Sequence, residues 1–279
     1  MRLRGVTRSR NVIDRRGRGG RAAGGIGGVG LLVVLAIGYF TGVDVTGLLD
    51  QAAPSQQSSD PRELTEAEQQ AGDFVARVLT TTEIVWTDVF PDQLGRSYSP
   101  PQLVLFSEVT QSGCGGASGS SGPFYCPADQ RAYLDTAFFG FMSQRLGAGG
   151  DFAAAYVIAH EVAHHVQNEL GILGQVHQLR ATMSERESNA LQVRVELQAD
   201  CLSGVWAYHV SDLLETGDLE EALNAAERIG DDYLQARAGR QPNPHTFTHG
   251  TSAQRMRWFQ NGRASGVVAD CDTFSAAQL

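Results

Sequence analysis

The stretch Tyr156-Val-Ile-Ala-His160-Glu161-Val-Ala-His164-His165-Val-Gln167 decides how the rest of the sequence is interpreted. It places His160 and His164 four residues apart in an apolar run that is typical of a buried helix. At about 3.6 residues per turn, positions four apart share one face of a helix, so both imidazoles can reach one metal ion. Glu161 lies about 100° around the helix from His160, where its carboxylate can contact a metal-bound water without binding the metal.

A second pair of polar residues supplies a third ligand. Glu196 and Asp200 are four apart in a helix that we expect from Ser184 to Leu213. Two His, one Glu and a water form a standard set for catalytic zinc, so we expect Glu196 to be the third ligand. Asp200, one turn later, is placed to accept the second ring N–H of a zinc histidine. The alternatives are a solvated helix face that carries two histidines and a surface carboxylate pair.

Together with several shorter stretches, these residues make the chain similar to a bacterial, membrane-anchored family of neutral zinc metallopeptidases, which belongs among the gluzincins. The resemblance covers nearly the whole chain except a linker. Ala163 departs from it, since Gly is expected there, but Ala favours the helix slightly and leaves the ligands unchanged. The stretches that carry the resemblance are Asn11–Gly17, Ser112–Gly115, Gly122–Asp129, Tyr133–Asp135, Ala159–Gln167, Glu196–Cys201, Ile229–Asp232, His249–Ser252 and Cys271–Phe274.

The resemblance implies an α+β fold, mainly helical and zincin-like with a small sheet, one Zn²⁺ per chain, and hydrolysis of peptide bonds in a peptide or protein substrate. Glu161 would take a proton from the metal-bound water and return it to the leaving amine. A donor is also needed where negative charge develops on the attacked carbonyl oxygen. We expect His249 to supply it, with His245 as the second choice, while a purely structural role for His249 stays open.

A non-enzymatic envelope interaction or scaffold module with a structural zinc is the competing functional class. Structural zinc sites are normally closed by a fourth protein ligand, and the sequence offers no obvious one, which favours the enzyme.

The charge distribution excludes another class of function. The chain has a formal net charge of −9. Residues 1–21 hold eight Arg and only one acidic residue, Asp14, so this segment carries +7 and the rest of the chain carries −16. This acidic body argues against nucleic-acid binding.

Residues 22–43 contain no charged side chain and, as a helix of about 33 Å, are long enough to cross a bilayer. Arg15, Arg16, Arg18 and Arg21 precede them, so the positive-inside rule predicts a basic cytoplasmic segment at 1–21. We expect a retained single-pass transmembrane helix in a bacterial cell membrane, a linker at 44–62, and an extracytoplasmic metallopeptidase domain at 63–279. A cleaved signal peptide and a twin-arginine signal are alternatives that also export the domain.

Four cysteines allow three pairings. We favour Cys114–Cys126, which would close a Gly/Ser loop, and Cys201–Cys271, which would tie the Glu196 helix to the C-terminus. Each could contribute about 2–4 kcal/mol in an oxidising compartment. A cysteine zinc site is disfavoured because the sequence has no Cys-x-x-Cys pair.

The remaining elements follow from hydrophobic periodicity and from residues that begin or end helices. The second expected strand, 132–139, or its neighbour is on resemblance a candidate to pair with extended substrate. Asp151 is a plausible N-cap for the zinc helix. The expected elements are helices at 66–80, 151–170, 218–237 and 252–262, and strands at 102–109 and 132–139.

Overall fold

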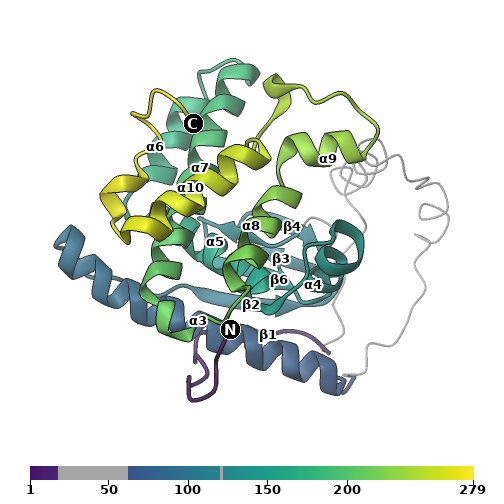
Figure 1. Cartoon of the computed structure of the whole chain (residues 1–279). Helices are drawn as coiled ribbons and strands as arrows, with labels where there is room; N and C mark the ends of the chain where they lie inside the picture. Colours follow the sequence, from purple (N-terminus) through teal and green to yellow (C-terminus); the bar gives the residue numbers. More distant parts are fainter. Residues whose placement is uncertain (18–61, 120–121) are drawn as a thin grey trace.

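A small sheet with a helical body on one face forms the framework of the computed structural model, which describes residues 1–17, 62–119 and 122–279 (Figure 1). The mainly helical α+β class expected from the sequence is confirmed. The expected transmembrane helix at 22–43 lies outside the described residues. Within the described ranges, no helix is both long enough and apolar enough to cross a membrane.

Along the chain, a short strand and a long helix come first, five further strands follow, and the remaining helices come last. The strands are β1 (Val12–Asp14), β2 (Gln102–Phe106), β3 (Val109–Ser112), β4 (Gly115–Ser118), β5 (Phe124–Cys126) and β6 (Arg131–Asp135). The α-helices are α3 (Glu66–Val89), α4 (Ala137–Phe141), α5 (Asp151–Glu169), α6 (Ile172–Arg180), α7 (Glu185–His209), α8 (Asp218–Arg228), α9 (Asp231–Arg237) and α10 (Ser252–Ser265). Shorter π or 3₁₀ turns are η1 (Phe90–Leu94), η3 (Met142–Leu146), η4 (Ser211–Leu213), η5 (Pro244–Thr246) and η6 (Val268–Cys271).

The main sheet has the strand order β1-β2-β6-β5, with β1, β2 and β6 parallel and β5 antiparallel to β6. Successive side chains of a strand point to opposite faces. Leu103 and Leu105 of β2 accordingly join the large core shared with the helices, whereas Val104 and Phe106 join a small separate cluster on the other face. One face of the sheet therefore carries the helical body.

Several expected elements differ from the structure. Strand β2 ends at Phe106 rather than at 109, and helix α7 ends at His209 rather than at Leu213. Helix α3 continues nine residues beyond Thr80, to Val89. The expected strand 132–139 ends at Asp135, because the carboxylate of Asp135 accepts a hydrogen bond from the Ala137 amide (2.9 Å) and the chain turns into α4. The expected helix 218–237 is two helices separated at Gly230, where α10 approaches so closely that a Cβ would lie 2.5 Å from the Ser252 nitrogen.

Helix α5 lies at the centre of the molecule. Of its 19 residues, 15 are buried, as expected for a helix that is covered on all sides. The expected N-cap role of Asp151 is wrong: Gly150 is the N-cap and Asp151 is the first helical residue. The Asp151 carboxylate instead accepts hydrogen bonds from the Met1 ammonium group, at 2.9 and 3.0 Å.

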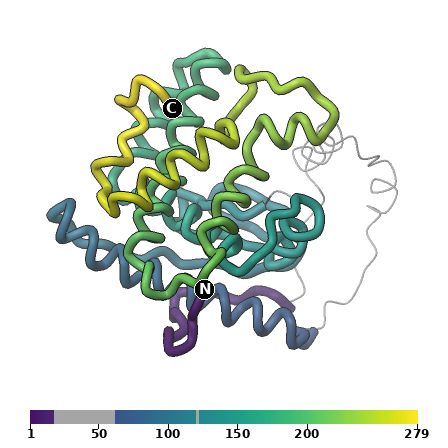
Figure 2. The backbone as a smooth tube through the Cα atoms, viewed as in Figure 1, coloured from purple at the N-terminus to yellow at the C-terminus, as the bar shows by residue number. Residues whose placement is uncertain are grey.

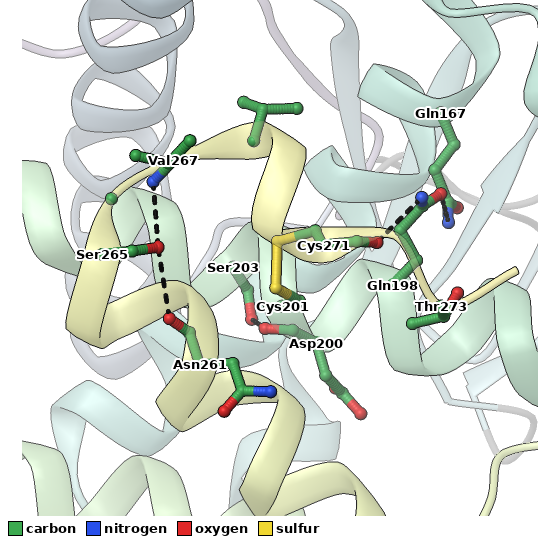
Figure 3. The surroundings of a disulfide bond; sticks show 12 residues. Gln167, Gln198, Asp200, Cys201, Ser203, Asn261, Ser265, Val267, Cys271 and Thr273 are labelled. Carbon is green, nitrogen blue, oxygen red and sulfur yellow. Dashed lines mark hydrogen bonds between the residues drawn. A yellow bond between two sulfur atoms is a disulfide. The ribbon is translucent and has the colours of Figure 1, made fainter. Parts of the chain in front are cut away.

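Helices α7 and α10 cross at very short range. A Cβ at Gly262 would lie 1.9 Å from the Cys201 carbonyl oxygen, so only glycine permits this crossing. The disulfide Cys201–Cys271 joins the same region of α7 to the C-terminal turn η6, beside Gln198 (Figure 3). The other disulfide is Cys114–Cys126, so both expected pairings are confirmed.

Residues 1–17 belong to the folded body. Figure 2 shows this segment, in purple, beside the long helix α3. Its strand β1 pairs with β2, and the Ser9 amide donates to the Ala76 carbonyl oxygen of α3 (3.0 Å). The expected domain boundary at residue 63 therefore omits a strand of the main sheet.

Candidate metal centre

Three side-chain atoms from α5 and α7 converge on one point. His160 Nε2 lies 3.2 Å from Glu196 Oε2, and His164 Nε2 lies 3.5 Å from the same oxygen. All three atoms lie within 4.8 Å of one another, and the three side chains are 9–13% exposed. The donor set of two imidazoles and one carboxylate suits zinc. The structure thus brings together the three ligands that the sequence predicts.

The second ring nitrogen, Nδ1, of each of the two histidines is held by a hydrogen bond. Asp200 Oδ1 lies 2.9 Å from His160 Nδ1, and Gln167 Oε1 lies 2.8 Å from His164 Nδ1. The Gln167 amide orientation is fixed, because its Nε2 donates to Val195 O (2.8 Å) and Gln198 Oε1. In the neutral form of each ring, Nδ1 therefore carries the proton, which leaves a lone pair on Nε2 for a metal ion.

Glu196 is oriented in the same manner. Gln192 Nε2 donates to Glu196 Oε1 (2.8 Å), so that Oε2 is the oxygen that faces the histidines. Arg180 of α6 in turn donates to Gln192 Oε1 (2.5 Å). Burial alone would raise the pKa of Glu196, but the charge of His164 and the hydrogen bonds from His160 and His164 outweigh it and hold that pKa well below its usual range.

Asp200 is completely buried and has two further partners. Arg255 of α10 donates to both of its oxygens, each at 2.9 Å, and the Tyr156 hydroxyl donates to Oδ1. Burial by itself would raise the pKa of Asp200, but Arg255 and His160 lower it to about 2. The carboxylate is therefore charged and fixed. In the absence of metal, burial lowers the pKa of His160, yet Asp200 and Glu196 raise it to about 10.

Glu161 is buried beside the ligands and, among the described contacts, makes no side-chain hydrogen bond to another residue. Desolvation raises its pKa above that of an ordinary glutamate, with the nearby His164 and His160 opposing the shift. A carboxylate with a raised pKa that lines a cleft beside a metal site is suited to accept a proton. This placement agrees with the role predicted from the motif.

The ligands line a cleft of about 530 Å³. Its walls come from β5, α4, α5, α6, α7, α9 and the loop of His249. The resemblance makes β6 or a neighbouring strand a candidate to pair with substrate. Strand β6 lies between β2 and β5 in the sheet, so both of its sides are already paired. The neighbour β5 is the edge strand and lines the cleft, so its free side is the one available to an extended chain.

His249 lines the cleft from the opposite wall, and its side chain is 49% exposed. Asp231 accepts hydrogen bonds from the backbone amides of Thr248, His249 and Gly250, and its Oδ1 lies 3.4 Å from His249 Nδ1. Burial would lower the pKa of His249, but Asp231 and then Glu196 raise it. The second choice, His245, is not among the residues that line the cleft.

Other histidine and tyrosine side chains near the site have structural contacts. His165 Nε2 lies 2.6 Å from Ser99 O and its Nδ1 lies 2.9 Å from the Tyr125 hydroxyl, which occupies both ring nitrogens. Tyr133 donates to Asp129. A second acidic group, Asp151, Asp218 and Glu221, could also be grouped as metal donors, but Asp151 and Asp218 bind the Met1 ammonium instead.

Sequence reasoning missed the residues that hold the ligands, namely Gln167, Gln192 and Arg255. Two of them carry a signal: Gln167 is three residues after His164, and Gln192 is four before Glu196, so each shares a helix face with its ligand. Arg255 comes from a distant helix and gives no such signal. The fold and the site together define a group of three side chains that could hold one metal ion, with a buried carboxylate beside it.

Comparison with known proteins identifies the family. The chain belongs to the family described as "Putative neutral zinc metallopeptidase", whose model matches residues 1–274. It is 47% identical over 285 residues to the uncharacterized protein YpfJ of Escherichia coli K12, covering 98% of this chain and 99% of that protein. It is 40% identical over 259 residues to the uncharacterized protein Rv2575 of Mycobacterium tuberculosis, covering 85% of each. No solved structure matches it.

Proposed function

We propose that the chain is a zinc-dependent peptidase that hydrolyses peptide bonds in an extended peptide or protein substrate. The observation that carries the proposal is the convergence of His160 Nε2, His164 Nε2 and Glu196 Oε2 beside the buried carboxylate of Glu161. Zinc held by these three residues would supply Lewis-acid polarisation and would lower the pKa of a water molecule. The remaining steps belong to the side chains of the cleft.

Glu161 accepts the proton of the attacking water and then transfers it to the amine that leaves. Its raised pKa suits both steps, because a group whose pKa is nearer the working pH can both take up and release a proton. His249 donates to the carbonyl oxygen as negative charge develops there, and Asp231 orients it. Edge strand β5 binds the substrate backbone through its free side.

The two disulfides support a location outside the cytoplasm, where such bonds persist. Attachment to the membrane through residues 22–43 stays a prediction from the sequence.

The test is cleavage of a diverse peptide mixture, read by mass spectrometry. The full chain is used, because β1 belongs to the sheet. Parent protein is compared with Glu161→Gln and with Glu169→Gln, the same chemical change farther along α5. We expect cuts by the parent and by Glu169→Gln that a chelator abolishes, and a loss of about 10²–10⁴ in rate for Glu161→Gln with zinc content unchanged. Equal cleavage by parent and Glu161→Gln would refute the mechanism. If neither cuts while both hold zinc, a non-enzymatic module is the better interpretation.

A further inference from the structure

We propose that residues 1–17 lie in the same compartment as the domain that follows Arg62, on one side of the membrane. This inference is independent of the proposed function. It differs from the single-pass arrangement predicted from the sequence, in which residues 1–21 stay in the cytoplasm while the domain is exported.

The first observation is the pairing of β1 in the main sheet. Val12, Ile13 and Asp14 lie opposite Leu103, Val104 and Leu105 of β2 in parallel register. The Leu103 amide donates to Asn11 O and the Arg15 amide donates to Leu105 O, both at 2.8 Å. Backbone pairing of this kind requires direct contact between the strands, which a bilayer between them would prevent.

The second observation concerns Arg15 and Arg16, which the positive-inside rule counts as topological signals. The side chain of Arg16 is 2% exposed; it pairs with Asp14 Oδ2 (2.7 Å) and donates to the Glu68 carbonyl oxygen of α3 (2.7 Å). Arg15 donates to Thr110 Oγ1 (3.2 Å) and to a neighbouring carbonyl oxygen. A buried guanidinium needs these partners, because an unpaired buried charge is strongly destabilising. Both arginines therefore have structural roles in the folded domain.

Further contacts along the segment bind it to α3. Ser9 Oγ and Asn11 Nδ2 both donate to Glu83 Oε1, at 2.5 and 2.7 Å. Arg77 donates to the Val6 carbonyl oxygen, and Arg8 pairs with Asp73. The segment thus contacts the domain over its length from Val6 to Arg16. The match to the family model also begins at residue 1, so the segment and the domain belong to one matched unit.

The third observation is the position of the two ends. The Arg62 amide donates to the Gly17 carbonyl oxygen (2.9 Å), so residues 18–61 begin and end at adjacent points. A single crossing would separate these points by the roughly 30 Å of the hydrocarbon core. The 22 residues of the apolar stretch 22–43 suffice for one crossing and not for two. The adjacent positions of Gly17 and Arg62 are therefore incompatible with a single crossing of the membrane between them.

The test is the accessibility of single cysteines in intact cells. All four native cysteines are in disulfides, so an added thiol is the sole target for a maleimide. Thr7→Cys reports on the segment, and Ala264→Cys on α10 reports on the domain; both positions are exposed. Neither substitution changes a charge, so the positive-inside signal is preserved. Each variant is treated with a membrane-impermeant maleimide before and after lysis, beside a cytoplasmic thiol protein as a control for integrity.

Equal labelling of Thr7→Cys and Ala264→Cys in intact cells supports the proposal. Labelling of the position 264 variant before lysis, with labelling of the position 7 variant only after lysis, would overturn it. If both label only after lysis, the shared compartment is supported and the extracytoplasmic location is refuted. Hydrogen exchange on the membrane-bound full chain checks the docking itself: slow exchange of the Arg15 amide is expected, and exchange as fast as in an unfolded peptide would contradict the pairing of β1.

Discussion

The two walls of the cleft hold their histidines in different ways. On one wall, His160 and His164 project from a buried helix, and each Nδ1 is held by the side chain of a buried residue. On the other wall, His249 projects from a loop, is half exposed and has Asp231 as its acidic partner. A metal ligand must be fixed before the metal binds, whereas a donor to a transition state acts only when substrate is present. The difference predicts that damage to the first wall costs metal and damage to the second costs rate.

The largest effect should distinguish two adjacent histidines of α5, of which His164 is an assigned ligand and His165 is not. His164→Asn removes a ligand atom, so zinc affinity should fall by well over the roughly 100-fold typical of losing an outer partner, and activity should be lost with it. His165→Asn should keep zinc but remove the contacts to Tyr125 and Ser99, lowering the free energy of unfolding by about 1–3 kcal/mol. Zinc content and thermal unfolding measure the two outcomes. Retention of stoichiometric zinc by His164→Asn would contradict the ligand assignment.

The next effect tests the loop wall. His249→Gln should reduce kcat by about 10²–10³, the usual result of removing one donor to the developing oxyanion. Zinc content should be unchanged, because His249 is not one of the three converging residues. His245→Gln is the matched control, since that residue is outside the cleft, and its kcat should equal that of the parent. If both variants behave like the parent, His249 has only a structural role.

A smaller effect is expected from the residues that orient the ligands. Gln167→Met keeps the length of the side chain but leaves His164 Nδ1 without its acceptor, so zinc affinity should fall by about 10–100-fold. The measurement is competition for zinc with a chelator of known affinity. Gln178→Met, on the exposed surface of α6, should have the affinity of the parent. An unchanged affinity in Gln167→Met would show that the histidine does not need this partner.

The contrast between the walls also explains what the sequence could predict. The helical period alone brings His160 and His164 together, and it predicts Glu196 and Asp200 on one face of a second helix. Periodicity works here because the residues concerned are one turn apart. It failed for the break at Gly230, since the pattern of apolar residues continues through a position that the close approach of α10 interrupts.

Contacts between distant segments gave no local signal. Gly204 of α7 and Gly262 of α10 let these two helices approach closely enough for Arg255 to reach Asp200, and no pattern near residue 255 reveals this. Strand β1 has three residues and is followed by arginines, so its composition indicated a topological signal more strongly than a strand. Arg15 and Arg16 are expected both for a topological signal and for a folded segment. Only their hydrogen bonds to Thr110 and Glu68 distinguish the two interpretations.

The smallest expected effect concerns Asp231, the residue on which the loop wall depends. Asp231→Asn retains an acceptor for His249 but removes the negative charge, and a charge-assisted hydrogen bond exceeds a neutral one by about 1 kcal/mol. We therefore expect kcat to fall about five- to tenfold with zinc content unchanged.

Asp231 raises the pKa of His249, so the charged form of His249 is present at low pH and is lost as pH rises through that pKa. Removing the carboxylate lowers the pKa, and the alkaline limb of kcat should move to lower pH. Asp232→Asn, whose carboxylate accepts from Ser252 rather than from His249, should leave that limb in place. A limb that does not move in Asp231→Asn would show that the titration of His249 does not control the rate.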